Sequence, residues 1–198
     1  MRGGRQDAAG ISRRRLIGAA GLGLAGTGTV LAGCESDVEP STAIVGSADR
    51  DAELLNGVLA DERGSAVVYI RATELFEGEN LRETAELFAK QEQEHAGALA
   101  KLIEDLGGEP EERESDERYA KKLELDKVTT QEEMLRFAVG LENETIAAYL
   151  AIVARLSTGE LRETVFQILA NEAEHLSVLL GDLGEPQVPD AFVVGTPK

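Results

Sequence analysis

The sequence repeats itself at an offset of 80 residues. The motif Leu81-Arg82-Glu83-Thr84 returns as Leu161-Arg162-Glu163-Thr164, and a gap-free match covers at least 62–99 and 142–179. A repeat this long, present only twice, indicates a duplicated helical hairpin and not a solenoid of short units. The chain is therefore expected to contain two similar hairpins.

Helix-forming residues dominate both copies. Ala, Leu and Glu lead the composition, aromatic residues make up 4%, and tryptophan is absent, which argues against a β-sandwich or barrel. Apolar side chains at a 3.6-residue spacing predict four long helices separated by turn-forming residues. Their expected ranges are about 49–78, 81–107, 131–157 and 160–183. We therefore predict an all-α four-helix bundle made of two antiparallel hairpins.

A long segment, 108–130, joins the two hairpins and is highly charged. A helix of about 27 residues is about 40 Å long, and about 23 extended residues span more than that. The segment is therefore long enough to run back along the bundle, so the third helix can begin at either end. Part of it, 111–125, is a candidate for a short surface helix.

Polar residues occupy the apolar face of each long helix near its middle. On the second helix, for example, Glu92 and His95 continue the spacing set by Phe88 and Leu99. An ionised carboxylate alone in a protein core is costly, so four of them need compensation. Two divalent cations would balance four carboxylates, and two imidazoles would complete the ligand set. The six candidate metal ligands are Glu62, Glu92, His95, Glu142, Glu172 and His175.

The pattern of these ligands is specific. One Glu comes from each of two helices, and a Glu-x-x-His motif comes from each of the other two, which places both ligands of each motif on one face. Over about 49–183 the chain resembles the ferritin-like superfamily, which includes rubrerythrins, bacterioferritins and manganese catalases. The resemblance implies a long crossover between the hairpins, in the order up-down-down-up, and a site for two iron ions, or alternatively manganese or mixed iron and manganese. The competing interpretation is that both histidines are ordinary core residues and the glutamates are half-exposed.

Two tyrosines follow the glutamates of the first and third helices. Tyr69 and Tyr149 lie two turns after Glu62 and Glu142, on the same helix faces. They are candidates for a hydrogen bond to a ligand or for a one-electron relay in catalysis. The alternative is ordinary packing, with each hydroxyl satisfied elsewhere.

The first 34 residues are typical of an export signal. Arg13-Arg14 precede a short Gly- and Ala-rich apolar run, in a pattern that resembles a twin-arginine signal. The run ends in Leu31-Ala32-Gly33-Cys34, which resembles a bacterial lipobox, where cleavage leaves Cys34 lipidated. We therefore expect a signal peptide over 1–34, a flexible tether over 35–50, the bundle over 51–183 and a tail over 184–198. One alternative is an uncleaved hydrophobic anchor with an incidental cysteine. Another, an unexported cytoplasmic enzyme, would require the Arg13-Arg14 and Cys34 signals both to be spurious.

Charge and cysteine content exclude several classes of function. A formal net charge of −17 argues against a surface that binds nucleic acid through its phosphates. One cysteine excludes a disulfide framework or an iron–sulfur cluster within the chain, so any electron donor must be external.

The expected function combines these observations. We expect an extracytoplasmic, membrane-anchored dimetal oxidoreductase of ferroxidase or peroxide-scavenging type, held to the membrane by lipid on Cys34. The alternative is a non-catalytic envelope lipoprotein that binds metal or a partner. A homodimer is compatible with either.

Overall fold

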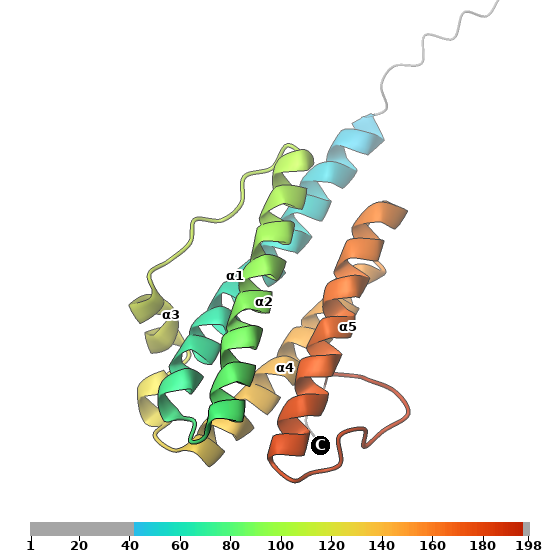
Figure 1. Ribbon diagram of the computed structural model, residues 1–198. Coiled ribbons are helices and arrows are strands. Elements are labelled where there is room, and N and C mark those ends of the chain that lie inside the picture. Colours follow the sequence, from blue (N-terminus) through green and yellow to red (C-terminus); the bar gives the residue numbers. More distant parts are fainter. Residues whose placement is uncertain (1–41, 196–198) are drawn as a thin grey trace, which may run out of the picture. The chain divides into compact units, whose positions relative to one another are not determined.

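The computed structural model describes residues 42–195, and that range is entirely helical apart from turns and loops. Two hairpins, α1–α2 and α4–α5, lie against each other (Figure 1). This confirms the predicted all-α fold. The predicted signal segment, Cys34 and the first part of the tether lie outside the described residues. The elements are α1 (Thr42–Leu75), α2 (Glu79–Asp105), α3 (Asp116–Lys122), the 3-10 turn η1 (Leu125–Lys127), α4 (Gln131–Val153) and α5 (Gly159–Asp182).

Matching contacts at the two ends of the bundle set the direction of the helices. At one end Asp51 of α1 accepts a hydrogen bond from the backbone N–H of Ser157, in the α4–α5 turn, at 3.1 Å. At the other end Gln131, the first residue of α4, accepts one from the backbone N–H of Glu77 at 2.6 Å. These two contacts are related by the 80-residue offset. Because α4 begins where α1 ends, α1 and α4 are antiparallel, and the four long helices run up-down-down-up.

The connection between the hairpins runs back along the bundle (Figure 1). Asn56 of α1 holds its beginning, donating to the Glu109 carbonyl at 2.9 Å and accepting from the Glu111 N–H at 2.8 Å. Ser115 caps the N-terminus of α3, and Tyr119 is buried between α3 and the bundle. The short helix lies within the range that the sequence suggested.

Two helix boundaries differ from the predicted ones by four residues or more. The first helix begins at Thr42, so 42–50 is helical where a tether was expected. Between Pro40 and the buried Ala52 only Gly46 is a strong helix breaker, so a helix stabilised by packing extends through it. The helix α4 stops at Val153, four residues early, and in the turn that follows the Leu156 carbonyl accepts a hydrogen bond from Arg162.

Apolar side chains form two separate core clusters. One contains Val68, Phe88 and Met134, and the other contains Leu55 and Ile146. Each fully buried side chain of this size contributes about 1.5–3 kcal/mol through removal from water. On every long helix the predicted ligands lie between residues of one cluster and residues of the other. The polar centre is therefore separated from bulk water along the bundle axis on both sides.

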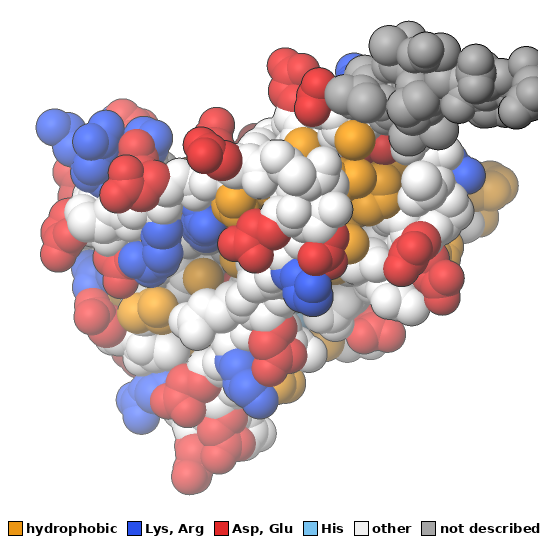
Figure 2. Space-filling view, turned by 90° about the horizontal axis from the view of Figure 1, so that it is seen from above, with side chains coloured by type: hydrophobic (Ala, Val, Ile, Leu, Met, Phe, Trp, Pro, Cys, Tyr) orange, Lys and Arg blue, Asp and Glu red, His pale blue; other side chains and the backbone are white. Residues whose placement is uncertain are grey.

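Acidic side chains dominate the surface. Figure 2, which views the molecule from above, shows Asp and Glu scattered over the visible face with Lys and Arg between them, and no continuous basic patch on that face. Within the described part of the chain, none of the helices is both long enough and apolar enough to cross a membrane.

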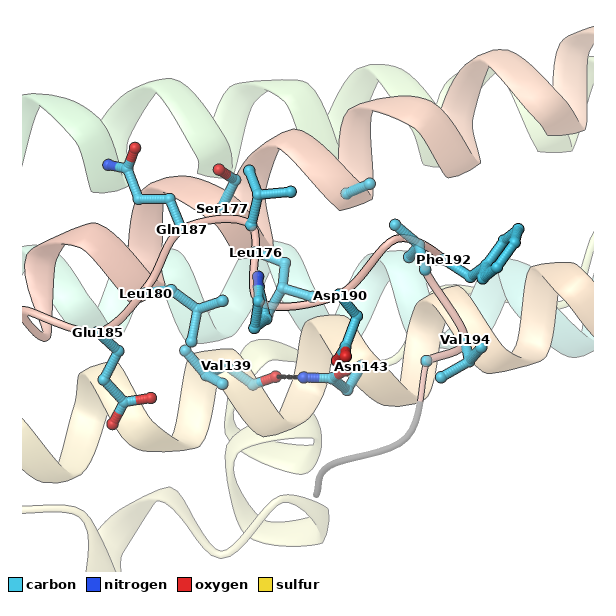
Figure 3. Close-up of a pocket in the computed structure, with 15 residues that line it drawn as sticks. Val139, Asn143, Leu176, Ser177, Leu180, Glu185, Gln187, Asp190, Phe192 and Val194 are labelled. Carbon is cyan, nitrogen blue, oxygen red and sulfur yellow. Dashed lines mark hydrogen bonds between the residues drawn. The ribbon is translucent and has the colours of Figure 1, made fainter.

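The C-terminal segment crosses the groove between α4 and α5 (Figure 3). It encloses a cavity of about 430 Å³ with side chains such as Val139 and Leu180. Gly195 ends this segment with a positive φ of 67°, and a Cβ there would lie 2.3 Å from the Ala147 backbone nitrogen. Glycine is therefore required at this close approach to α4. None of the predicted metal ligands lines this cavity.

Candidate metal centre

The six predicted ligands come together in the middle of the bundle. α1 and α4 each contribute one glutamate, and α2 and α5 each contribute a Glu-x-x-His pair. The i, i+3 spacing puts both residues of each pair on the inward face of their helix. All four glutamates and His175 are fully buried, and His95 is 12% exposed.

Two overlapping groups of ligand atoms lie within this cluster. Glu62 and His95 belong to one group, which we call half-site 1, and Glu142 and His175 belong to the other, half-site 2. Glu92 and Glu172 belong to both and are called the shared glutamates. In each group one potential ligand atom per residue lies within 4.8 Å of the others. This is the arrangement expected for two metal ions with two carboxylates between them.

The distances around each histidine are similar. In half-site 1 the Nδ1 atom of His95 lies 3.2 Å from Glu62 Oε2 and 2.9 Å from Glu172 Oε1. In half-site 2 the Nδ1 atom of His175 lies 3.5 Å from Glu142 Oε1 and 3.1 Å from Glu92 Oε1. Both imidazoles therefore direct the same nitrogen, Nδ1, at the carboxylates.

The two tyrosines link the half-sites across the α1–α4 interface. Tyr69 of α1 donates a hydrogen bond to Glu142 of α4, and Tyr149 of α4 donates one to Glu62 of α1. Glu62 and Glu142 each belong to one half-site only, and we call them the terminal glutamates. Each tyrosine hydroxyl therefore orients the terminal glutamate of the opposite copy of the repeat. This geometry corresponds to the hydrogen-bonding alternative considered from the sequence, and not to packing alone.

Comparison with known protein families agrees with the four-helix fold and the ligand cluster. A family described as a ferritin-like domain matches residues 50–185, which is more than half of the chain. The chain belongs to the ferritin-like family. No curated protein matched the sequence.

The donor set of this ferritin-like chain fits a dimetal group. Both carboxylate oxygens of Glu92 and of Glu172 are buried without a hydrogen-bond partner, as are one oxygen of Glu142 and Nδ1 of His175. Buried polar atoms are otherwise almost always satisfied, and each one left alone costs about 1–3 kcal/mol. Carboxylates and imidazoles together suit iron or manganese better than copper. These atoms approach one another within the cluster, as His175 Nδ1 and Glu92 Oε1 do at 3.1 Å, and they are the atoms that two cations would bind.

Proton binding shows how strongly these groups depend on one another. Burial alone lowers the pKa of His95, but contacts with Glu172, Glu62 and Glu92 outweigh it and raise the pKa to about 12. The pKa of His175 rises to about 11 for the same reason, through Glu142, Glu172 and Glu92. Without metal, both imidazoles therefore carry a proton at neutral pH.

The carboxylates divide into two kinds. Burial chiefly raises the pKa of Glu62 and Glu142 well above the ordinary value. For Glu172 burial acts in the same direction, but both histidines outweigh it and lower the pKa to about 2. Burial also raises the pKa of Tyr69 and Tyr149, so both phenols keep the protons that they donate. The cluster thus contains ionised and protonated carboxyl groups together.

Two further residues surround His175 that the sequence did not identify as part of the site. Gln91 Oε1 lies 2.9 Å from His175 Nε2, and the ring of Phe88 stacks on the imidazole at 3.9 Å. A carboxamide that accepts from the second ring nitrogen fixes the orientation of a metal-binding histidine. One signal was available, because the repeat places an amide, Asn171, at the position that corresponds to Gln91.

Proposed function

We propose that this chain is a dimetal oxidoreductase of ferroxidase or peroxide-scavenging type, with two iron ions, or manganese or a mixed pair, as its cofactor. The observation that carries the proposal is the set of buried oxygen atoms on Glu92 and Glu172, which make no regular hydrogen bond, contact the two histidines and are shared between two ligand groups. A purely structural bundle would gain stability by replacing such groups with apolar side chains.

Each part of the centre has a definite task under this proposal. Glu62 and His95 would hold one ion, Glu142 and His175 the other, and the shared glutamates would bind both. Four carboxylates balance the charge of two divalent ions. The tyrosine hydroxyls keep the terminal glutamates in place, and the apolar clusters on either side exclude water.

The bound metal would supply electrons. A ferrous pair held by the four glutamates and two histidines would supply the two electrons that, with two protons, reduce hydrogen peroxide to two water molecules. The chain has one cysteine, so it contains no iron–sulfur cluster of its own to return those electrons. A turnover cycle would therefore need an external reductant.

Metal analysis followed by an oxidant test decides between the candidate functions. We expect the purified protein to contain about two Fe or Mn per chain, and the reduced protein to consume peroxide or oxygen in repeated turnovers when a small-molecule reductant is supplied. Two metals without turnover would favour metal sequestration instead. Absence of metal, even after anaerobic reconstitution with ferrous iron, would overturn the proposal.

A matched pair of variants ties the result to the centre. Glu92 is buried and shared, whereas Glu94 lies two residues away on the exposed side of α2, beside Lys90. Glu92→Ala should lose the metal and the oxidant reaction, and Glu94→Ala should keep both. Equal loss in the two variants would point to a general effect of acidic residues and not to this site.

We also propose that the chain is exported and anchored by lipid on Cys34. The support is the order of the sequence signals, with Arg13-Arg14 before the apolar run and the lipobox-like segment at its end. Cys34→Ala should release the protein from the membrane fraction, and Arg13→Lys with Arg14→Lys should retain it in the cytoplasm. Arg2→Lys serves as the control. Unchanged membrane association of Cys34→Ala would overturn the lipid anchor.

A further inference from the structure

Two hydroxyl groups in the middle of the bundle are buried without a partner. Ser65 of α1 is 1% exposed and Thr145 of α4 is 2% exposed, and neither hydroxyl oxygen has a hydrogen-bond partner within the part of the chain that the structure describes. The two residues are related by the 80-residue offset. The same unpaired polar group therefore occurs at the same place in both copies of the hairpin.

This is not the usual state of a hydroxyl in a helix. A helical Ser or Thr ordinarily donates to a carbonyl of the preceding turn. Other threonines of the long helices do so, with Thr73 donating to Ile70 at 2.7 Å and Thr84 donating to Asn80 at 2.9 Å. Ser65 and Thr145 lack this bond although they are far more deeply buried. Their donors remain available for something else.

The helix register places both hydroxyls at the centre of the α1–α4 interface. The tyrosine hydrogen bonds set position 69 opposite 142 and position 62 opposite 149. Halfway between these pairs lie positions 65–66 of α1 and 145–146 of α4. Ser65 and Thr145 therefore both lie within one residue of the crossing point, between the two Tyr–Glu pairs.

The helix register also places both residues on the helix faces that carry the ligands. Ser65 lies one turn after Glu62 and one turn before Tyr69, so the three share one helix face. Thr145 has the same relation to Glu142 and Tyr149. Since the glutamates and tyrosines of this face point inward, the hydroxyls lie on the α1–α4 side of the centre, across from the shared glutamates of α2 and α5.

The charge of the surroundings indicates what these donors bind. The carboxylates of the centre are acceptors, and both tyrosine hydroxyls already donate to Glu62 and Glu142. Ser65 and Thr145 are thus the uncommitted hydroxyl donors on this side of the centre. A donor that faces a site for cations is suited to a small anion bound to those cations.

We propose that Ser65 and Thr145 form a hydroxyl pair that donates hydrogen bonds to a small anion, of the size of hydroxide or azide, held at the dimetal centre. This inference rests on the proposed metal binding. The hydroxyls act as positioning groups: they orient the anion between the half-sites, and the metals provide most of its affinity.

Azide binding to the cobalt(II)-loaded protein tests the proposal without use of the enzymatic reaction. Visible absorption reports both the stoichiometric binding of Co(II) and the later binding of azide. Loss of one hydrogen bond to a charged group should weaken azide binding about tenfold or more. We expect that loss for Thr145→Val and for Ser65→Ala, a loss of about 100-fold for the double variant, and near wild-type affinity for Thr145→Ser.

A second measurement separates this role from a structural one. Because the hydroxyls are unpaired, their removal should leave the Tm of the metal-free protein unchanged or higher by about 2–4 °C. Thr84→Val, which removes a hydroxyl that donates to a carbonyl, is the comparison. A lower Tm for Thr145→Val would mean that its hydroxyl has a structural partner and would overturn the proposal.

The outcomes of the cobalt experiment are distinct. A wild-type protein that binds no Co(II) would refute the proposed metal centre, and the hydroxyl pair with it. A wild-type protein that binds two Co(II) ions but shows the same azide affinity as the double variant would refute the hydroxyl pair alone.

Discussion

The two half-sites come from a duplication, yet their histidines have different surroundings. His175 is 1% exposed, stacks on Phe88 and contacts Gln91 through Nε2. His95 is 12% exposed, and its Nε2 has no hydrogen-bond partner among the described residues. The repeat gives Ile168 at the position of Phe88 and Asn171 at that of Gln91. Asn171 is one methylene shorter and donates to Glu174 at 3.3 Å instead.

The two copies therefore share the geometry of the ligands but differ in the side chains that support them. Both half-sites keep one Glu, one His and the tyrosine contact, so both can bind a metal. Only half-site 2 keeps the outer contacts that orient its imidazole. We therefore expect solvent, and a metal ion in exchange with solvent, to reach the centre through half-site 1. The predictions below test this asymmetry.

The largest effect should come from a ligand that the half-sites share. Glu172→Ala removes a carboxylate that belongs to both groups and contacts both histidines, so we expect loss of both metals. His95→Ala removes a ligand from half-site 1 only and should leave about one tightly bound ion. Elemental analysis after gel filtration measures both. One metal retained by Glu172→Ala and none by His95→Ala would reverse the assignment of shared and terminal ligands.

The next largest effect is the dependence of metal binding on pH, which should be similar in the two half-sites. His95 and His175 have pKa values of about 12 and 11 without metal, so each must lose a proton when a metal binds. The overall constant for binding both ions should then rise with pH by at least about 100-fold per pH unit near neutrality, and by more where Glu62 and Glu142, whose pKa values burial raises, also release protons. Calorimetric titration in buffers of different ionisation enthalpy counts the released protons. Release of fewer than two would mean that one imidazole is neutral in the metal-free protein.

Packing around the histidines should produce a smaller difference in stability. His175→Ala loses the stack on Phe88 and the Gln91 contact in addition to its carboxylate contacts. We expect it to lower the free energy of unfolding of the metal-free protein by about 1–2 kcal/mol more than His95→Ala does. Urea unfolding followed by circular dichroism measures this. In a Phe88→Leu background the difference should shrink, and equal losses in the original background would contradict the asymmetry.

The helices and the ligand positions could be predicted from the sequence because the two copies of the repeat show the same pattern independently. Each copy gives the same helix faces, and a carboxylate in mid-helix on an apolar face has few explanations other than a metal or a partner. The six residues that the structure brings together were therefore identifiable from periodicity and charge. Periodicity left the direction of α4 open, because a linker of this length can reach either end of the bundle, and the predicted order up-down-down-up came from the resemblance to the ferritin-like superfamily. That choice depends on contacts such as Gln131 with Glu77, which join residues far apart in the sequence.

The outer contacts of the centre were only weakly indicated by the sequence, through the amides Gln91 and Asn171 at matching repeat positions. Gln91 resembles any polar residue on a helix surface, and only the path of α5 brings His175 to it. The start of α1 at Thr42 shows a related limit, because packing of 52–75 extends the helix into residues whose composition indicates a linker. Periodicity identifies which face of a helix is buried, but it does not show which neighbour buries it.

The smallest effect is expected when the two amide side chains at matching repeat positions, Gln91 and Asn171, are exchanged in length. Gln91→Asn shortens the side chain that contacts His175 and should weaken the metal in half-site 2 about tenfold, the lower end of what such supporting contacts contribute. Asn171→Gln gives half-site 1 an amide of the length found in half-site 2 and should slow the exchange of its metal severalfold. Competition with a chelator and the rate of metal release measure the two effects. If the changes in metal affinity and release rate in the double variant equal the product of the changes in the single variants, each amide acts on its own histidine. If Asn171→Gln changes nothing while Gln91→Asn weakens binding, then exposure of His95, and not the missing amide, makes half-site 1 the open one.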